Sequence, residues 1–237
     1  MKLYEGGIKD FKTLLKNCVL MKLNNPEKKW QVKKQEELIL RSDMAYELGG
    51  GTKHAISGLA FTTDETLVSK DGCYFVGKDL SDISEDCDYA RITLIRLKKD
   101  AFDNQQGNEV YDMLRKIDFA RYHVYPNGFM LRISAVKERE CARVSKDAIK
   151  QGISFSHVGD CFAKEYHLRP EVEAVETYFI TGSMFDFDIC NQIVHKWEQI
   201  TESLNRIFEG FTMDCGSCNL KEICDEVEGL REMHEKR

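Results

Sequence analysis

The sequence predicts an α/β or α+β fold in which a mixed β-sheet is flanked by helices. Two observations carry this prediction. Short segments of β type, separated by turn residues, fill the region between residues 36 and 97, and segments of helical period then alternate with further strands. This order of elements is typical of folds that cover a sheet with layers of helix. A chain of 237 residues is long enough to bury such a core without disulfide bonds.

The first element expected is a helix over about residues 8–23. Its apolar residues recur at helical spacing, and the segment "NNPEKK" then interrupts the pattern; these residues are Phe11, Leu14, Leu15, Cys18, Val19 and Leu23. The strands expected next are "LILRS", "MAYEL", "HAISGLAF", "CYFVG" and "YARITLIRL". We expect these strands to belong to one sheet.

Helical period returns over residues 109–122, and "FMLRIS" alternates as a strand after the turn "YPNG". Two shorter helices are expected over residues 137–150 and 154–168, the second ending before Pro170 because proline cannot continue it. The segment "EAVETYFIT" then has the composition of a buried strand. A long final helix carries an apolar stripe from Cys190 to Phe208, with Ser183 expected to cap its start and Gly210 to end it.

We expect one domain over residues 1–210, followed by a cysteine-rich tail over residues 211–237, because no linker or repeat divides the first part. The net charge of -6 and the even spread of basic residues argue against nucleic acid as a partner. No apolar run approaches the ~20 residues needed to cross a bilayer, and no secretion signal is visible. A cytoplasmic protein with no membrane contact is therefore expected.

Three cysteines gather in the segment "MDCGSCNLKEIC", as Cys215, Cys218 and Cys224. A Cys-x-x-Cys turn brings two sulfurs to one metal, and the third cysteine is close enough along the chain to join them. Because cytoplasmic thiols stay reduced, metal ligands are favoured over disulfides. Thiolates at this density suit an iron–sulfur cluster or zinc, and softness alone does not separate the two. The alternative is a tail of unliganded thiols.

The sequence does not select a fourth ligand for this site. His234 lies ten residues beyond Cys224 in a segment expected to be largely helical, where ten residues span ~15 Å. The other candidates are the remaining cysteines, of which Cys141 and Cys190 are expected in the core; they are Cys18, Cys73, Cys87, Cys141, Cys161 and Cys190. A cluster with one open iron site, or a ligand from a partner, is the remaining alternative.

The segment "ELGGGTKHAISG" offers a second candidate site. Gly49, Gly50 and Gly51 can present successive N–H groups to an anion, with Lys53 beside them. The glycine order of phosphate loops and dinucleotide folds is absent, so we expect a turn between two strands, with ligand binding as the alternative. In "SHVGDC", a helix would place His157 and Cys161 on one face as a base and nucleophile, but a capping or packing role for His157 is favoured.

Five segments, in order, resemble the middle domain of acetyl-CoA synthase, the β subunit of the carbon monoxide dehydrogenase/acetyl-CoA synthase complex. They extend over roughly residues 43–181, and the fourth is the most specific: "MAYELGGGTKHAISGLAF", "YFVGKDLSDISE", "FMLRIS", "SKDAIKQGISFSHVG" and "ETYFIT". The resemblance implies the fold of that domain. It also implies an A-cluster, a 4Fe-4S cubane bridged to two nickels, at which a methyl group from a corrinoid protein, carbon monoxide and CoA are joined.

The resemblance extends into the tail. Cys215 and Cys218 look like the opening Cys-x-x-Cys pair of the family's cluster segment, and Cys224 looks like its next cluster cysteine. No cysteine follows Cys224, so the later Cys-x-Cys that holds nickel in this family has no counterpart here. We therefore do not expect this chain to make acetyl-CoA by itself, and its status as an enzyme stays open.

Three functional hypotheses follow. The preferred one is a stand-alone relative of acetyl-CoA synthase with a 4Fe-4S cluster on the tail cysteines and a docking or electron-transfer role in the one-carbon or corrinoid metabolism of an anaerobe. Its partners would be a corrinoid protein, carbon monoxide dehydrogenase or a ferredoxin-type protein. The second is a scaffolding module whose tail holds zinc or no metal and which recognises a corrinoid or dehydrogenase partner. The third is a synthase subunit completed by another chain that supplies the nickel ligands.

Overall fold

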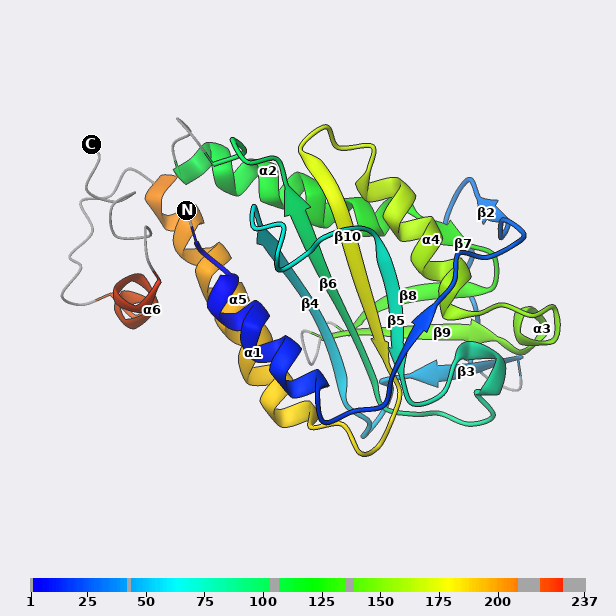
Figure 1. The fold of residues 1–237 in the computed structure, drawn as a ribbon. Helices are drawn as coiled ribbons and strands as arrows, with labels where there is room; N and C mark the ends of the chain where they lie inside the picture. Colours follow the sequence, from blue (N-terminus) through cyan, green and yellow to red (C-terminus); the bar gives the residue numbers. More distant parts are fainter. Residues whose placement is uncertain (1, 42–43, 103–106, 135–138, 209–217, 228–237) are drawn as a thin grey trace.

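The fold is a mixed α/β arrangement, seen in a computed structural model whose described residues are 2–41, 44–102, 107–134, 139–208 and 218–227. Figure 1 shows a twisted sheet with helices on both faces and a smaller sheet beside it. The elements are, in chain order, α1 (Glu5–Leu15), β1 (Leu20–Leu23), β2 (Val32–Lys33), β3 (Ala45–Leu48), β4 (Ala55–Thr62), β5 (Gly72–Val76), η2 (Leu80–Asp82), β6 (Tyr89–Leu97), α2 (Gly107–Phe119), η3 (Ala120–His123), β7 (Tyr125–Pro126), β8 (Phe129–Ser134), β9 (Arg139–Ser145), α3 (Lys146–Lys150), α4 (Phe155–Tyr166), β10 (Val172–Ile180), α5 (Phe187–Phe208) and α6 (Lys221–Glu226).

The central sheet has five strands in the order β1-β5-β10-β6-β4. Strand β10 runs parallel to β5 and antiparallel to β6, while β4 runs parallel to β6, so the sheet is mixed as predicted. Strands β6 and β10 are buried along almost their whole length. Their near-continuous apolar sequences reflect this, because a strand covered on both faces has no side that must be polar.

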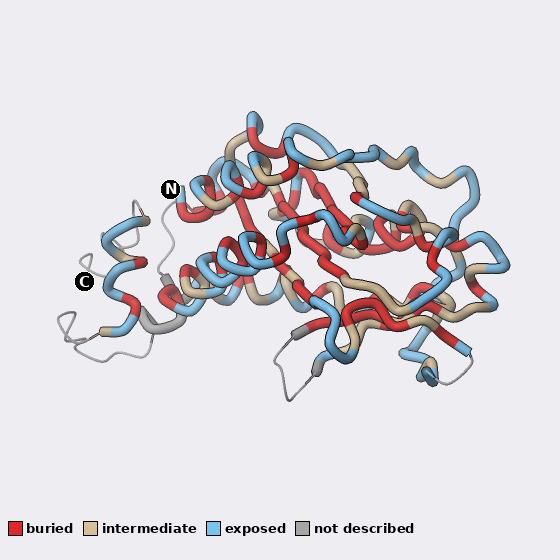
Figure 2. Tube along the Cα trace, turned by 90° about the horizontal axis from the view of Figure 1, so that it is seen from below, coloured by how far each residue is buried: buried red, intermediate tan, exposed pale blue. Residues whose placement is uncertain are grey.

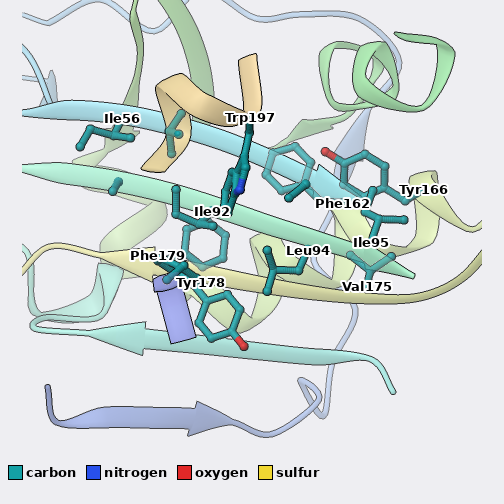
Figure 3. Packing of buried hydrophobic residues seen from close by; sticks show 14 of the residues in the cluster. Ile56, Ile92, Leu94, Ile95, Phe162, Tyr166, Val175, Tyr178, Phe179 and Trp197 are labelled. Atoms are coloured by element: carbon teal, nitrogen blue, oxygen red, sulfur yellow. The ribbon is translucent and has the colours of Figure 1, made fainter. Parts of the chain in front are cut away.

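Two helical layers cover the faces of this sheet. On one face, Phe11 of α1 makes edge-to-face contacts with Tyr178 of β10 and with Trp197 of α5. On the other face, Phe155 of α4 stacks on Phe179 of β10 at a centroid distance of 4.3 Å. Figure 3 shows Ile92 and Leu94 of β6 within this core. Successive side chains of each strand point to opposite faces of the sheet, so each strand contributes side chains to the core on both faces.

A three-stranded antiparallel sheet, in the order β3-β9-β8, lies beside the central sheet, and β2 pairs with β7 in a two-stranded ribbon. Strands β4 and β9 contact one another, so the two larger sheets share a boundary. The prediction of a single sheet is wrong on this point, because "MAYEL" forms β3 and pairs with β9 rather than with the central strands. The predicted strand "LILRS" is also wrong, because the described residues 38–41 form no strand.

Two helix predictions are also wrong in part. The expected helix over residues 8–23 is α1, which spans Glu5–Leu15, and the following residues turn and enter β1 against β5. The expected helix over residues 137–150 contains strand β9 over most of its described part, and only Lys146–Lys150 is helical. In both places, pairing with a neighbouring strand overrides a pattern that is compatible with a helix.

The remaining helices lie close to their predicted positions. Helix α4 ends before Pro170, and the predicted apolar stripe of α5 is buried from Cys190 to Leu204, the part whose side chains the structure describes. Asp186, rather than Ser183, caps α5, because its carboxylate accepts the Ile189 N–H at 2.9 Å. None of the described helices is both long and apolar enough to span a membrane.

Candidate functional site

Two of the three tail cysteines lie at helix α6. Cys218 precedes the helix, and its carbonyl accepts the Lys221 N–H at 3.2 Å, while the Cys224 N–H donates to the Leu220 carbonyl at 3.1 Å. Both cysteine residues are half-buried. Leu220 and Ile223 are buried, and α6 packs against α5, as the left side of Figure 1 shows. The described part of the tail is therefore anchored to the domain.

The complete three-cysteine site extends beyond the described part of the chain, because Cys215 and His234 lie outside it. Among the described residues, no group of three or more His, Cys, Asp or Glu side chains is arranged to hold a metal ion. The donor chemistry of Cys218 and Cys224 suits an iron–sulfur cluster or zinc, both of which bind thiolates. The metal site at Cys215, Cys218 and Cys224 therefore stays a prediction.

The triple glycine forms a turn between β3 and β4, which confirms the expected turn. Gly49 and Gly51 have φ values of +79° and +59°, a region that glycine adopts at little cost. The Gly49 N–H donates to the Cys87 carbonyl at 2.8 Å, and the Lys53 N–H donates to the Gly50 carbonyl at 3.0 Å. A Cβ atom at Gly50 would overlap the Glu47 side chain. The glycines thus have structural roles, and ligand binding by Gly49, Gly50, Gly51 and Lys53 stays a prediction.

An arginine cluster surrounds the carboxylate of Glu47 on β3. Arg132 of β8 donates to it, and Arg143 of β9 and Arg41 approach it at 3.3 and 3.5 Å. The register places Glu47 opposite Arg143, so cross-strand pairing brings these charges together. Arg41 also donates to Asp86 at 2.6 Å. The cluster joins the three-stranded sheet to the loop before β6.

A second charged cluster is buried between the two larger sheets. Arg91 of β6 donates through Nε to Glu140 of β9 at 3.1 Å, and its Nη2 donates to Ser57 at 3.1 Å. Glu140 also faces Arg121 at 3.3 Å, and Arg121 pairs with Asp118 at 2.5 Å. The side chains of Arg91 and Glu140 are only 1% and 4% exposed. Buried charges of this kind persist only when they are paired.

The protonation states of this cluster follow from its geometry. Burial by itself would raise the pKa of Glu140, but the guanidinium groups of Arg91 and Arg121 outweigh burial and lower it. Burial likewise opposes the charge on Arg91, but Glu140 outweighs it and raises the pKa of Arg91. The pair is therefore ionised at neutral pH and ties β6 to β9.

Sequence reasoning missed both charged clusters, because a charged residue in an alternating strand is normally interpreted as facing solvent. The available signal was Arg91 inside "YARITLIRL", a segment that contains no other charged residue before Arg96. Other expectations are confirmed: Cys141 and Cys190 are buried, and His157 caps helix α4 by accepting the Ser154 N–H at 3.1 Å.

Comparison with curated proteins gives no match for this chain. A family model described as the CO dehydrogenase/acetyl-CoA synthase complex beta subunit matches residues 32–184. The matched region contains β2 to β10 and the helices between them, while α1, β1, α5 and α6 flank it. Because the match covers more than half of the sequence, the chain belongs to the CO dehydrogenase/acetyl-CoA synthase complex beta subunit family.

Proposed function

We propose that this acetyl-CoA synthase-related chain binds an iron–sulfur cluster of the 4Fe-4S type through Cys215, Cys218 and Cys224. Its role would be docking or electron transfer in the one-carbon or corrinoid metabolism of an anaerobe. The observation that carries the proposal is the family membership of a domain that is followed by these three cysteines. A bound cluster would supply one-electron redox chemistry.

The packing of α6 supports the proposal. Ile223 and Leu220 anchor the helix, and Lys196 of α5 pairs with Glu226 at 3.4 Å. Cys218 and Cys224 lie on this packed segment, so they lose little further conformational entropy when they bind a metal. This favours binding. Because the family is named for a complex with carbon monoxide dehydrogenase, that enzyme is the first partner we propose, followed by a corrinoid or ferredoxin-type protein.

The test is purification of the full chain without oxygen, followed by iron, sulfide, zinc and nickel analysis and visible spectroscopy. We expect roughly four iron and four sulfide ions per chain and an absorption band that dithionite bleaches. Cys218→Ser and Cys224→Ser should each lower the iron content. Cys18→Ser is the matched control and should keep it, because Cys18 follows the end of α1, which lies well away from α6 in Figure 1.

Each other outcome has a defined meaning. A folded, colourless protein without iron refutes the cluster. One zinc per chain instead supports a scaffolding module that recognises a corrinoid or dehydrogenase partner. Nickel that appears only when a second polypeptide co-purifies supports a synthase subunit completed by that chain.

A further inference from the structure

The two edges of the central sheet differ in how far other elements cover them. Strand β4, at one edge, is buried at most of its residues and contacts β9 and α5. Strand β1, at the other edge, is exposed at Leu20, Met21 and Lys22 and half-buried at Leu23. Figure 1 shows β1 as the blue strand beside β5. The edge formed by β1 therefore faces solvent.

Strand β1 is hydrogen-bonded to a neighbouring strand along one side only. It pairs antiparallel with β5, from Leu20 opposite Val76 to Leu23 opposite Cys73. Within the part of the chain that the structure describes, no other strand pairs with it. An edge strand presents N–H and C=O groups along its outer side, and an extended segment of another chain can hydrogen-bond to them. The central sheet can therefore gain a strand at β1.

The two faces of β1 differ in chemistry. Lys22 lies opposite Tyr74, which stacks on Tyr178 on the face that α1 covers. Met21 and Leu23 lie on the other face, that of α4, because successive side chains of a strand alternate. Side chains directly opposite one another on paired strands share a face and interact. An added strand would therefore place a polar side chain beside Lys22 and apolar side chains beside Met21 and Leu23.

The charge around β1 has the opposite sign to that of the whole chain. Residues 16–29 contain four lysines and one acid, Glu27, so this segment carries a charge of +3, whereas the chain carries -6. All five charged residues are exposed, and none of them forms an ion pair with a described residue; the lysines are Lys16, Lys22, Lys28 and Lys29. The segment therefore attracts negative charge.

The neighbouring strands do not supply that negative charge. Strand β5 contains no charged residue. The two acids of β10 are already paired, Glu173 with Arg96 at 3.3 Å and Glu176 with Lys12 at 2.9 Å. A second copy of this chain would bring the same lysines to the edge, and like charges on paired strands repel. The charges therefore favour an acidic segment of a different protein.

We propose that the outer edge of β1 binds an extended acidic segment of a partner protein by strand addition. The backbone of the segment hydrogen-bonds to β1, one of its carboxylates lies beside Lys22, and its apolar side chains contact Met21 and Leu23. Strand β1 lies before residue 32, so this surface is outside the region that the family model matches. The surface uses none of the tail cysteines, so the proposal stands or falls independently of the iron–sulfur cluster.

The probe is a seven-residue peptide with blocked ends in which glutamate alternates with valine, added to the full chain at about 0.1 M salt. We expect it to bind and to slow hydrogen exchange at the β1 amides that do not bond to β5. A peptide with lysine in place of glutamate should bind at least about tenfold more weakly, because it repels the lysines around β1. The glutamate peptide N-methylated at its three central residues should be weakened similarly, because it loses backbone donors.

Two charge-reversal variants test the position of the site. Lys22→Glu should weaken binding of the glutamate peptide at least about tenfold. Lys99→Glu is the matched control, because Lys99 is exposed in the turn after β6, and β10 and β5 lie between β6 and β1. It should keep the affinity within about twofold, since charges beyond the Debye length of about 10 Å are largely screened.

No binding of the glutamate peptide, equal binding of the three peptides, or equal effects of the two variants each overturns the proposal. A dimer of the free protein that protects the same β1 amides also overturns it, because a second copy then occupies the edge.

Discussion

At the residue scale, two adjacent glycines in α1 have opposite environments. A Cβ atom at Gly7 would overlap the indole nitrogen of Trp197, whereas a Cβ atom at Gly6 would meet nothing within 4 Å. Gly7 therefore sets how closely α1 approaches α5. Gly6 has no such role, and there glycine only lowers the helix propensity.

We predict that Gly7→Ala destabilises the protein by about 1–3 kcal/mol, because α1 must move away from Trp197. Gly6→Ala should stabilise it by up to about 1 kcal/mol, since alanine is the better helix former. Urea unfolding of both variants beside the wild type measures this. Equal stability of the two variants would show that Gly7 does not control the contact.

Glu140 is the residue on which the buried charged cluster depends. Glu140→Gln removes its charge and leaves Arg91 buried without an anion, so we expect a loss of about 3–5 kcal/mol in the free energy of unfolding. Asp147→Asn is the control, because Asp147 is 76% exposed and its carboxylate pairs with Lys150 on the surface. Its effect should stay within about 0.5 kcal/mol.

Glu140 should also make the free energy of unfolding depend on pH. The pKa of Glu140 is lower in the folded than in the unfolded state, so the unfolded chain binds the proton more readily. The stabilisation is therefore complete above the unfolded pKa of ~4.3 and is lost as pH falls through the folded pKa. Between pH 6 and pH 3, the unfolding free energy of the wild type should fall more steeply than that of Glu140→Gln. Parallel curves would contradict this.

At the element scale, α6 is a short helix whose position depends on a few buried side chains. Ile223→Ala removes one of them and should loosen the helix, because six residues form no stable helix without tertiary contacts. We predict faster hydrogen exchange at the Cys224 and Val227 amides, which are hydrogen-bonded within this segment. Glu222→Ala, at an exposed neighbouring position, should leave the exchange unchanged.

The errors in element prediction have one physical origin. Strand β9 has buried residues on both faces, Cys141 on one and Ala142 and Val144 on the other, and it also buries Glu140. Glu140 is charged, so the sequence of this segment is compatible with a helix that has a polar side. The segment forms strand β9 because it pairs with β3 and β8. Strand β1 is similar, because its edge pairing with β5 interrupts a helical pattern.

At the scale of the whole molecule, the family-matched residues do not form a complete layered fold. The central sheet has one face covered by α1 and α5, and both helices lie outside residues 32–184. Figure 2 shows these helices with buried residues along their inner sides. Removing them would expose Ile92, Tyr178 and Ala60, which are buried in the core.

We predict that a fragment of residues 32–184 aggregates or binds a hydrophobic dye, because it exposes an apolar sheet face. A fragment of residues 1–210 keeps both helices and should unfold cooperatively on heating. Circular dichroism and dye fluorescence of the two fragments provide the comparison. A monomeric, cooperatively folded 32–184 fragment would show that α1 and α5 are dispensable.

The sequence by itself determined the α/β class, the mixed character of the sheet, the long apolar helix α5 and the family, because these depend on periodicity and on local motifs. Tertiary structure alone decided which strands share a sheet, because pairing partners lie far apart along the chain. It also brought Arg91 to Glu140, two residues that lie 49 positions apart in the chain, an arrangement without a local signature. Buried charge pairs form only when folding brings distant residues together, whereas the sequence shows only that each residue is charged.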